Sequence, residues 1–139
     1  MSEQIKFSQD GRILRITFNR PEDNGVSDRM AAALIESLNT AHETSDMVVI
    51  RSVGPDFCTG RVRGPDFPPA SPEAYTRRDE YDSIFGSYKA IRACQIPVIT
   101  VLEGRVMGFG TAITALSDIS FASDQATFNI PEIEHNVMP

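Results

Sequence analysis

Two glycine-containing segments carry the strongest chemical signal in this sequence. Residues 103–112 (EGRVMGFGTA) follow the apolar run 96–102, a pattern that predicts a buried strand leading through a tight turn into a helix. The first N–H groups of a helix have no intrahelical acceptor, and they suit an anion or a developing negative charge. Residues 54–62 follow a second apolar run, 47–53, in a similar way. Two such strand ends can supply two N–H donors to one oxygen atom.

Other common kinds of site find no support in the sequence. Gly104, Gly108 and Gly110 do not form the G-x-G-x-x-G spacing of a dinucleotide site, and no G-K-[ST] follows them. Histidine, cysteine and carboxylate residues show no metal-ligand spacing, so we expect no bound metal. Cys58 and Cys94 lie far apart in the sequence, and we interpret them as reduced thiols.

The composition is typical of one soluble globular domain spanning residues 1–139. Of the 139 residues, 41% are hydrophobic and 23% are charged. The net charge of −6 argues against a nucleic-acid-binding protein, which would present a basic face. The first residues are polar, so we expect no secretory signal, and no apolar run is long enough to cross a membrane. We therefore expect a cytoplasmic protein with no membrane partner.

Strands and helices are expected to alternate along the chain. Asp10-Gly11 between apolar stretches predicts a hairpin, and Ser27 followed by Asp28 predicts a helix N-terminus. The expected elements are strands 5–7 and 13–18, helix 28–43, strand 46–53, a helix from Ser71 to about residue 95, strand 98–102, helix 110–116, and strands 119–122 and 126–130. The second helix is expected to carry on one side Tyr75, Tyr81, Ile84, Phe85, Tyr88 and Ile91. This order predicts an α/β fold with a largely parallel sheet.

Four segments in register resemble the crotonase superfamily, the family of enoyl-CoA hydratases and isomerases. They are residues 19–24 (NRPEDN), 57–61 (FCTGR), 97–118, and 126–133 (ATFNIPEI). The resemblance covers nearly the whole chain, although members of that family are about twice as long. It implies a crotonase-like ββα spiral, of which residues 1–139 form a partial acyl-CoA-binding domain without the C-terminal helical layer.

The resemblance implies chemistry on an acyl-CoA thioester whose carbonyl oxygen becomes enolate-like. An α-proton is too weakly acidic to be removed unless that oxyanion is stabilised, and two backbone N–H donors meet this need. By family position the donors belong to Arg61 and Phe109. The residues implied around the coenzyme A arm and the turns beside it are Asp23, Gly25, Cys58, Gly60, Val62 and Gly108. Coenzyme A is then part of the substrate, and no separate cofactor is expected.

One of the two carboxylate positions of family hydratases lacks a carboxylate here. The first position, after the second glycine turn, falls on Ala112, whereas the second falls on Glu132. A single carboxylate suits a proton shift in which one base takes a proton and returns it. We therefore predict isomerase-type enoyl-CoA chemistry with Glu132 as the base, its pKa raised by apolar neighbours such as Ile130 and Ile133.

Several alternatives stay open from the sequence alone. Another group could replace the missing carboxylate in a hydratase or hydrolase, or the chain could bind acyl-CoA without catalysis. The competitors of Glu132 as acid–base groups are Asp118, Glu134 and His135, of which Asp118 is expected to order a turn. Because Asp23 stands where the family often has a basic residue, Arg20 or Arg63 is the expected phosphate contact. Family members associate as trimers, often paired into hexamers, and the resemblance implies a homotrimer or hexamer.

Overall fold

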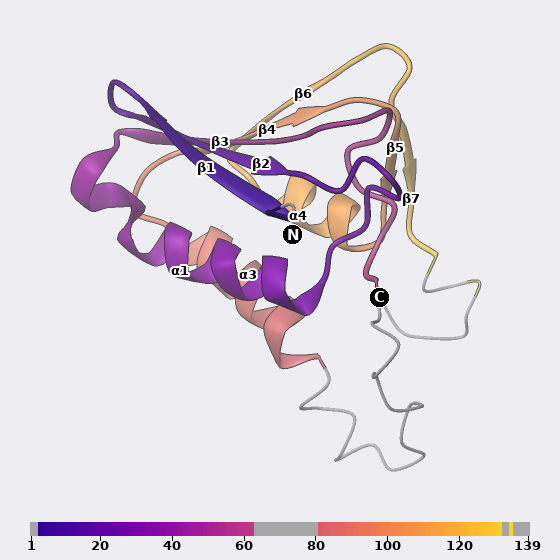
Figure 1. Cartoon of the computed structure of the whole chain (residues 1–139), viewed down its shortest axis with the longest axis horizontal. Coiled ribbons are helices and arrows are strands. Elements are labelled where there is room, and N and C mark those ends of the chain that lie inside the picture. The colour runs from indigo at the N-terminus through magenta and orange to yellow at the C-terminus, as the bar shows by residue number, and fades with distance from the viewer. Residues whose placement is uncertain (1–2, 63–80, 132–133, 135–139) are drawn as a thin grey trace.

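The computed structural model describes residues 3–62, 81–131 and 134, and it shows a twisted sheet with helices packed beside it (Figure 1). The elements are β1 (Ile5–Asp10), β2 (Ile13–Phe18), α1 (Asp28–Thr44), β3 (Met47–Ser52), α3 (Asp82–Ala93), β4 (Val98–Leu102), β5 (Arg105–Met107), α4 (Phe109–Leu116), β6 (Ile119–Ala122) and β7 (Thr127–Asn129). The main sheet has the order β1-β2-β3-β4-β6, and it is parallel apart from the β1–β2 hairpin. The predicted α/β fold is confirmed.

The hydrophobic core lies between the main sheet and the helices α1 and α3. Alternate residues of the central strands point into it, among them Ile50 and Val98, both fully buried. Helix α1 begins where predicted, because the Ser27 Oγ accepts the Met30 N–H at 3.3 Å and caps the first turn. The same helix buries Leu34 and further apolar side chains against the sheet. Removal of this apolar surface from water is the main force that holds the layers together.

A second layer of short segments follows the strands of the main sheet. Isolated parallel bridges join Val26 to Arg61 and Cys58 to Val106, and β5 pairs with β7 in a two-stranded sheet. Each of β2, β3, β4 and β6 is thus followed by a segment of the second layer, which is the ββα spiral that the resemblance implied. The sequence predicted only a turn at β5. A three-residue strand between glycines is too short to show periodicity, and its partners lie far away in the chain.

The last two described strands differ from the core strands in their burial. All four residues of β6 are exposed, and Phe121 is 60% exposed, more than any other large apolar side chain of the described residues. Phe128 in β7 and Ile130 after it are 52% and 46% exposed. The apolar pattern of these strands therefore predicted their existence but not their burial.

Helix α3 carries its described apolar residues on one side, as predicted. Its described part begins at Asp82, and the predicted start at Ser71 lies outside the described residues. Ile84 and Ile91 are buried, whereas Phe85 is 53% exposed. Phe85 still lies on the same side, because its ring centroid is 6.1 Å from that of Tyr81 and 6.0 Å from that of Tyr88. The predicted apolar side is therefore confirmed for the described residues, with Phe85 at its exposed edge. Among the described residues, no helix combines the length and the apolar character needed to span a membrane.

Candidate functional site

The two glycine turns predicted from the sequence lie side by side in the second layer. The Cys58 N–H donates to the carbonyl oxygen of Arg105 at 3.1 Å, and the Met107 N–H donates to the carbonyl oxygen of Cys58 at 2.8 Å. On the other side of the same segment, the Val26 N–H donates to the Gly60 carbonyl oxygen at 2.9 Å. Main-chain hydrogen bonds therefore hold the first turn against β5, which leads directly into α4.

Gly60 and Gly108 set the direction of the chain before the two expected oxyanion donors. Gly60 has a φ of +112° and Gly108 a φ of +49°, in the region that residues with a Cβ rarely adopt. Arg61 follows the first glycine. Phe109 follows the second and is the first residue of α4, so its N–H has no carbonyl four residues earlier within the helix to accept it. Each glycine thus precedes a residue whose N–H was assigned to the oxyanion.

Both turns line one pocket of about 130 Å³. The described residues that line it are Gly60, Arg61, Tyr81, Ile84, Tyr88, Gly108, Phe109 and Pro131. The structure therefore brings together the predicted turn residues from two distant parts of the chain. It also places there Pro131, the residue directly before Glu132. Glu132 lies outside the described residues, so its catalytic role stays a prediction.

Two further glycines let the segments around this pocket approach each other closely. A Cβ on Gly110 would lie 2.6 Å from the Cβ of Cys58, and a Cβ on Gly25 would lie 1.9 Å from Cγ2 of Val62. Such distances are far below van der Waals contact, so neither position accepts a larger residue unless the neighbouring atoms shift. The predicted coenzyme A contacts Gly25 and Val62 therefore touch each other, while their contact with the coenzyme stays a prediction.

Cys58 is a buried neutral thiol behind the first turn. Burial raises the pKa of the Cys58 thiol to about 11, because the thiolate loses its hydration, and hydrogen bonds from the backbone of Gly60 and Gly110 offset this only in part. The Gly60 N–H lies 3.4 Å from Sγ. A thiol of this kind is a poor nucleophile near neutral pH, so the side chain supports the turn rather than the chemistry.

Asp23 is engaged within its own loop. Its Oδ1 accepts hydrogen bonds from Nε of Arg20 at 3.0 Å and from the Gly25 N–H at 2.8 Å. The bond from Arg20 is the main reason why the pKa of Asp23 is lowered. Arg20, one of the two expected phosphate contacts, is thus paired with Asp23. The other, Arg63, lies outside the described residues.

The side chain of Arg61 ties the first turn to two helices. Its Nη2 lies 2.9 Å from Oδ1 of Asp28 in the first turn of α1, and Ser83 Oγ donates to the same oxygen at 2.9 Å. The guanidinium also lies over the ring of Tyr81, 5.5 Å from its centre. Only 13% of the Arg61 side chain is exposed. This arginine therefore anchors the turn, and its backbone remains the part assigned to the oxyanion.

An ion pair between Asp56 and Arg105, which was not predicted from the sequence, joins the two turns. Asp56 Oδ1 accepts the Arg105 N–H at 2.8 Å, and Oδ2 lies 2.8 Å from Nη2 of the same arginine. The carboxylate is buried because Gly104 leaves room for it: a Cβ there would lie 2.7 Å from Oδ1. These bonds lower the pKa of Asp56, with the guanidinium as the largest cause. The sequence feature that could have suggested this ion pair is Asp56 itself, a charged residue directly before Phe57.

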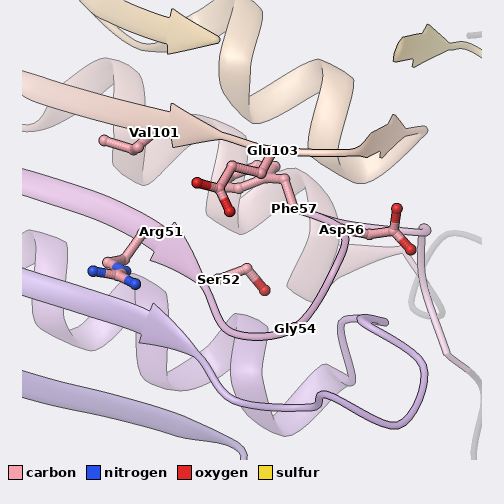
Figure 2. Close-up of a pocket in the computed structure, with 7 residues that line it drawn as sticks. All are labelled: Arg51, Ser52, Gly54, Asp56, Phe57, Val101 and Glu103. Atoms are coloured by element: carbon pink, nitrogen blue, oxygen red, sulfur yellow. The ribbon is translucent and has the colours of Figure 1, made fainter. Parts of the chain in front are cut away.

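A second pocket, of about 110 Å³, lies between the ends of β3 and β4 (Figure 2). It is lined by Arg51, Ser52, Gly54, Asp56, Phe57, Val101 and Glu103. Figure 2 shows the Asp56 carboxylate turned away from Arg51, on the far side of the loop. None of these lining residues belongs to the predicted oxyanion pair, so this hollow is separate from the candidate site.

The other acid–base candidates have different surroundings. Ala112 lies in the first turn of α4, where its N–H donates to the Gly108 carbonyl oxygen at 3.0 Å. Asp118 Oδ2 accepts the Val98 N–H at 2.8 Å, so its role is structural, although the bond reaches the first residue of β4 and not the turn that it was expected to order. Glu134 is exposed, and His135 lies outside the described residues. Within the part of the chain that the structure describes, no group of three or more His, Cys, Asp and Glu side chains could hold a metal ion.

Comparison with known proteins assigns the chain to a family. The profile of the enoyl-CoA hydratase/isomerase family matches residues 8–139. The chain belongs to this family. One relative, the (7aS)-7a-methyl-1,5-dioxo-2,3,5,6,7,7a-hexahydro-1H-indene-carboxyl-CoA hydrolase of Mycobacterium tuberculosis, is 28% identical over 129 residues, 91% of this chain and 51% of that protein. Another, the peroxisomal enoyl-CoA delta isomerase 3 of Mus musculus, is 30% identical over 146 residues, 99% of this chain and 44% of that protein.

Solved structures of the enoyl-CoA hydratase/isomerase family share the fold. The crystal structure of an enoyl-CoA hydratase/isomerase from Marinobacter aquaeolei is 26% identical, with a TM-score of 0.87 over 99% of this chain and 55% of that one. The present chain spans about half the length of the curated relatives it matches. The membership that the sequence motifs implied is therefore confirmed.

Proposed function

We propose that this member of the enoyl-CoA hydratase/isomerase family binds an acyl-CoA with its thioester group at the 130 Å³ pocket and moves the double bond of the acyl group by proton transfer. The observation that supports the proposal is the meeting of Gly60-Arg61 and Gly108-Phe109 beside Pro131. The two turns supply N–H groups for a developing oxyanion. The residue that follows Pro131 in the sequence is Glu132, the one carboxylate that this sequence retains of the two family positions.

The proposed reaction is a 1,3-proton shift. Glu132 takes a proton from C2 of a 3-enoyl thioester, and the electron pair of that C–H bond moves through C2 to the carbonyl oxygen. The Arg61 and Phe109 N–H groups donate to the resulting enolate oxygen, a contribution of roughly 3–4 kcal/mol per donor in other enzymes. The proton then returns at C4, and the double bond lies between C2 and C3. No atom is gained or lost.

Ala112 favours this isomerase-type reaction over hydration. Addition of water across a double bond is usually served by two acid–base groups that hold the water, and a methyl side chain cannot supply the second. The relatives include both a hydrolase and an isomerase by name, so family membership does not select the reaction. A cytoplasmic homotrimer or hexamer, with the coenzyme arm along Asp23, Gly25, Cys58, Gly60 and Val62, belongs to the same proposal.

Proton exchange tests the proposal directly. The purified protein is incubated in heavy water with 3-enoyl and 2-enoyl thioesters of coenzyme A, and deuterium at C2 and C4 is followed by NMR. We expect exchange and isomerisation with the native sequence, and a loss of at least about 100-fold in Glu132→Gln because the base is removed. Glu134→Gln is the matched control and should retain activity.

Three results would contradict the proposed reaction. Unchanged exchange in Glu132→Gln would remove Glu132 from the mechanism. Thioester binding without any exchange would favour a non-catalytic acyl-CoA-binding chain. Hydration that rises in Ala112→Glu from a detectable level in the native protein would favour the hydratase alternative, in which another group already holds the water. Native mass spectrometry of the same sample reports the oligomeric state.

A further inference from the structure

Glycine residues leave the turn before α4 with little rigidity of its own. Phe109 lies between Gly108 and Gly110, and glycine has more conformational freedom to lose on folding than any other residue. Gly108 is also the N-cap of α4, where no side chain is available to bond the first helical N–H groups. An N–H group stabilises an oxyanion best when its direction is fixed, because a preorganised donor costs no reorganisation during the reaction. Another group must therefore hold Phe109 in place.

The hydroxyl group of Thr111 provides this contact. Its Oγ1 donates to the Val106 carbonyl oxygen at 2.7 Å and to the Asn129 carbonyl oxygen at 3.0 Å, so one hydrogen is shared between two acceptors. The Gly108 N–H donates to the same oxygen of Asn129 at 3.0 Å. The residue before Phe109 and the second residue after it are thus bonded to a single carbonyl group of β7.

The direction of these bonds keeps the donors of the turn available. A threonine at the start of a helix usually accepts a hydrogen bond from a backbone N–H. The Thr111 hydroxyl instead donates to carbonyl oxygens of β5 and β7, which pair in parallel so that Met107 lies opposite Asn129. It therefore holds the first turn of α4 without occupying the Phe109 N–H that the proposed reaction needs.

We propose that Thr111 is a positioning residue, whose hydroxyl ties the first turn of α4 to β5 and β7 and so fixes the direction of the Phe109 N–H. This inference rests on the proposed function, in which that N–H donates to the enolate oxygen. The Thr111 hydroxyl itself donates to the protein backbone, so it acts through Phe109 and takes no part in the proton transfer.

Two valine variants of the same helix test the role of the hydroxyl in catalysis. Thr111→Val keeps the branched shape and removes the donor. Thr114→Val is the matched control, because Thr114 is also half-buried and its Oγ1 donates at 2.7 Å to the Gly110 carbonyl oxygen within α4. For isomerisation of a 3-enoyl thioester of coenzyme A, we expect kcat to fall roughly 10- to 100-fold in Thr111→Val, with KM nearly unchanged. Thr111→Ser retains the hydroxyl and should recover most of kcat, whereas Thr114→Val should leave kcat nearly unchanged.

Amide hydrogen exchange measures the rigidity of the turn without any turnover. The Gly108 N–H donates to Asn129, and the Ala112 N–H donates to the Gly108 carbonyl oxygen at 3.0 Å, so these two amides bracket Phe109. In NMR exchange experiments without substrate, both amides should exchange about tenfold faster in Thr111→Val than in Thr114→Val, because the lost bond lowers the free energy of local opening. Amides of β3 and β4 should exchange at equal rates in the two variants, which checks that global stability is matched.

The results separate this inference from the proposed reaction. Equal exchange of Gly108 in the two valine variants, or an equal fall of kcat in both, would overturn the role of Thr111. Faster exchange in Thr111→Val with unchanged kcat would overturn it as well, because the hydroxyl would then hold the turn without positioning the donor. A native protein that isomerises no thioester would overturn the proposed reaction, whereas the exchange rates of Gly108 and Ala112 would still support or overturn the anchoring by Thr111.

Discussion

The two turns that meet in the pocket are built in different ways. The turn at Gly60-Arg61 is held by a charged side chain, because the Arg61 guanidinium reaches Asp28 on α1 at 2.9 Å. The turn at 104–109 also has a charged contact, between Arg105 and Asp56, but it depends in addition on two positions without a side chain. Gly104 lies against the Pro55 carbonyl oxygen, and Gly108 has a φ of +49°. The first turn therefore depends on the ion pair of its arginine, and the second depends on steric room as well as on an ion pair.

The difference predicts which substitutions each turn tolerates. Charge changes should matter at the first turn, while an added methyl group should matter most at the second. Asp56 belongs to both, since its carboxylate follows β3 and binds the N–H and guanidinium of Arg105 at the start of β5. Substitutions of Gly104, Asp56 and Arg61 therefore test whether the two turns depend on different interactions.

The largest effect is expected for Gly104→Ala. The new Cβ would lie 2.1 Å from the Pro55 carbonyl oxygen, and Gly104 has a φ of +60°. We expect a loss of about 2–5 kcal/mol in the free energy of unfolding, measured by urea denaturation, because a backbone atom cannot yield as a side chain can. Gly11→Ala is the control, since Gly11 has a φ of +57° and no atom within 4 Å of the added Cβ. It should cost only about 1–2 kcal/mol. Equal losses would show that steric contact at Gly104 is unimportant.

Removal of the carboxylate that joins the turns should have the next largest effect. Asp56→Ala leaves the Arg105 N–H without its acceptor, and we expect a loss of about 1–3 kcal/mol in urea denaturation. Asp56→Asn retains an oxygen acceptor and should lose less. A loss in Asp56→Asn equal to that in Asp56→Ala would mean that the charge of the pair, rather than the hydrogen bond to the backbone, carries the stabilisation.

The pH dependence of stability follows from the same carboxylate. Since the pKa of Asp56 is lowered in the folded protein, chiefly by the Arg105 guanidinium, its contribution is present above the ordinary carboxyl pKa of about 4. The contribution is lost as the pH falls through the lowered value. Asp56→Asn should therefore flatten the fall of unfolding free energy below about pH 4. Asp124→Asn, an exposed carboxylate on the turn before β7, is the control and should leave the slope nearly unchanged.

A smaller effect is expected for Arg61→Met. The variant keeps the backbone N–H but loses the ion pair with Asp28, whose side chain is 44% exposed, so we expect a loss of about 1 kcal/mol in stability. Because the turn is then less firmly held, kcat for the isomerisation should fall more than KM rises, by up to about 100-fold. Arg105→Met removes a guanidinium that is 60% exposed, and its stability, kcat and KM are compared with those of Arg61→Met. Unchanged kcat in Arg61→Met would show that backbone bonds alone hold the first turn.

Most of the elements could be predicted because their signals are local. The Ser27 cap, the Asp10-Gly11 hairpin and the apolar runs of β3 and β4 lie within a few residues of the structure they produce. The two glycine turns could be found for the same reason. Strand β5 could not, because its pairing with Cys58 and with β7 depends on segments dozens of residues away.

The features of the candidate site can be separated in the same way, into those that local sequence predicts and those that depend on distant contacts. By itself the sequence determined the α/β order of elements, the two glycine turns and the absence of a carboxylate at Ala112, because these depend on residue type and near neighbours. Only the tertiary structure decided that Asp56 binds Arg105, that Arg61 is anchored by Asp28, and that Tyr88 stacks on Phe109. Such contacts follow from the packing of α3 against α4 and from the meeting of the segment after β3 with β5 and α1. Side-chain partners that distant leave no periodic pattern in the chain.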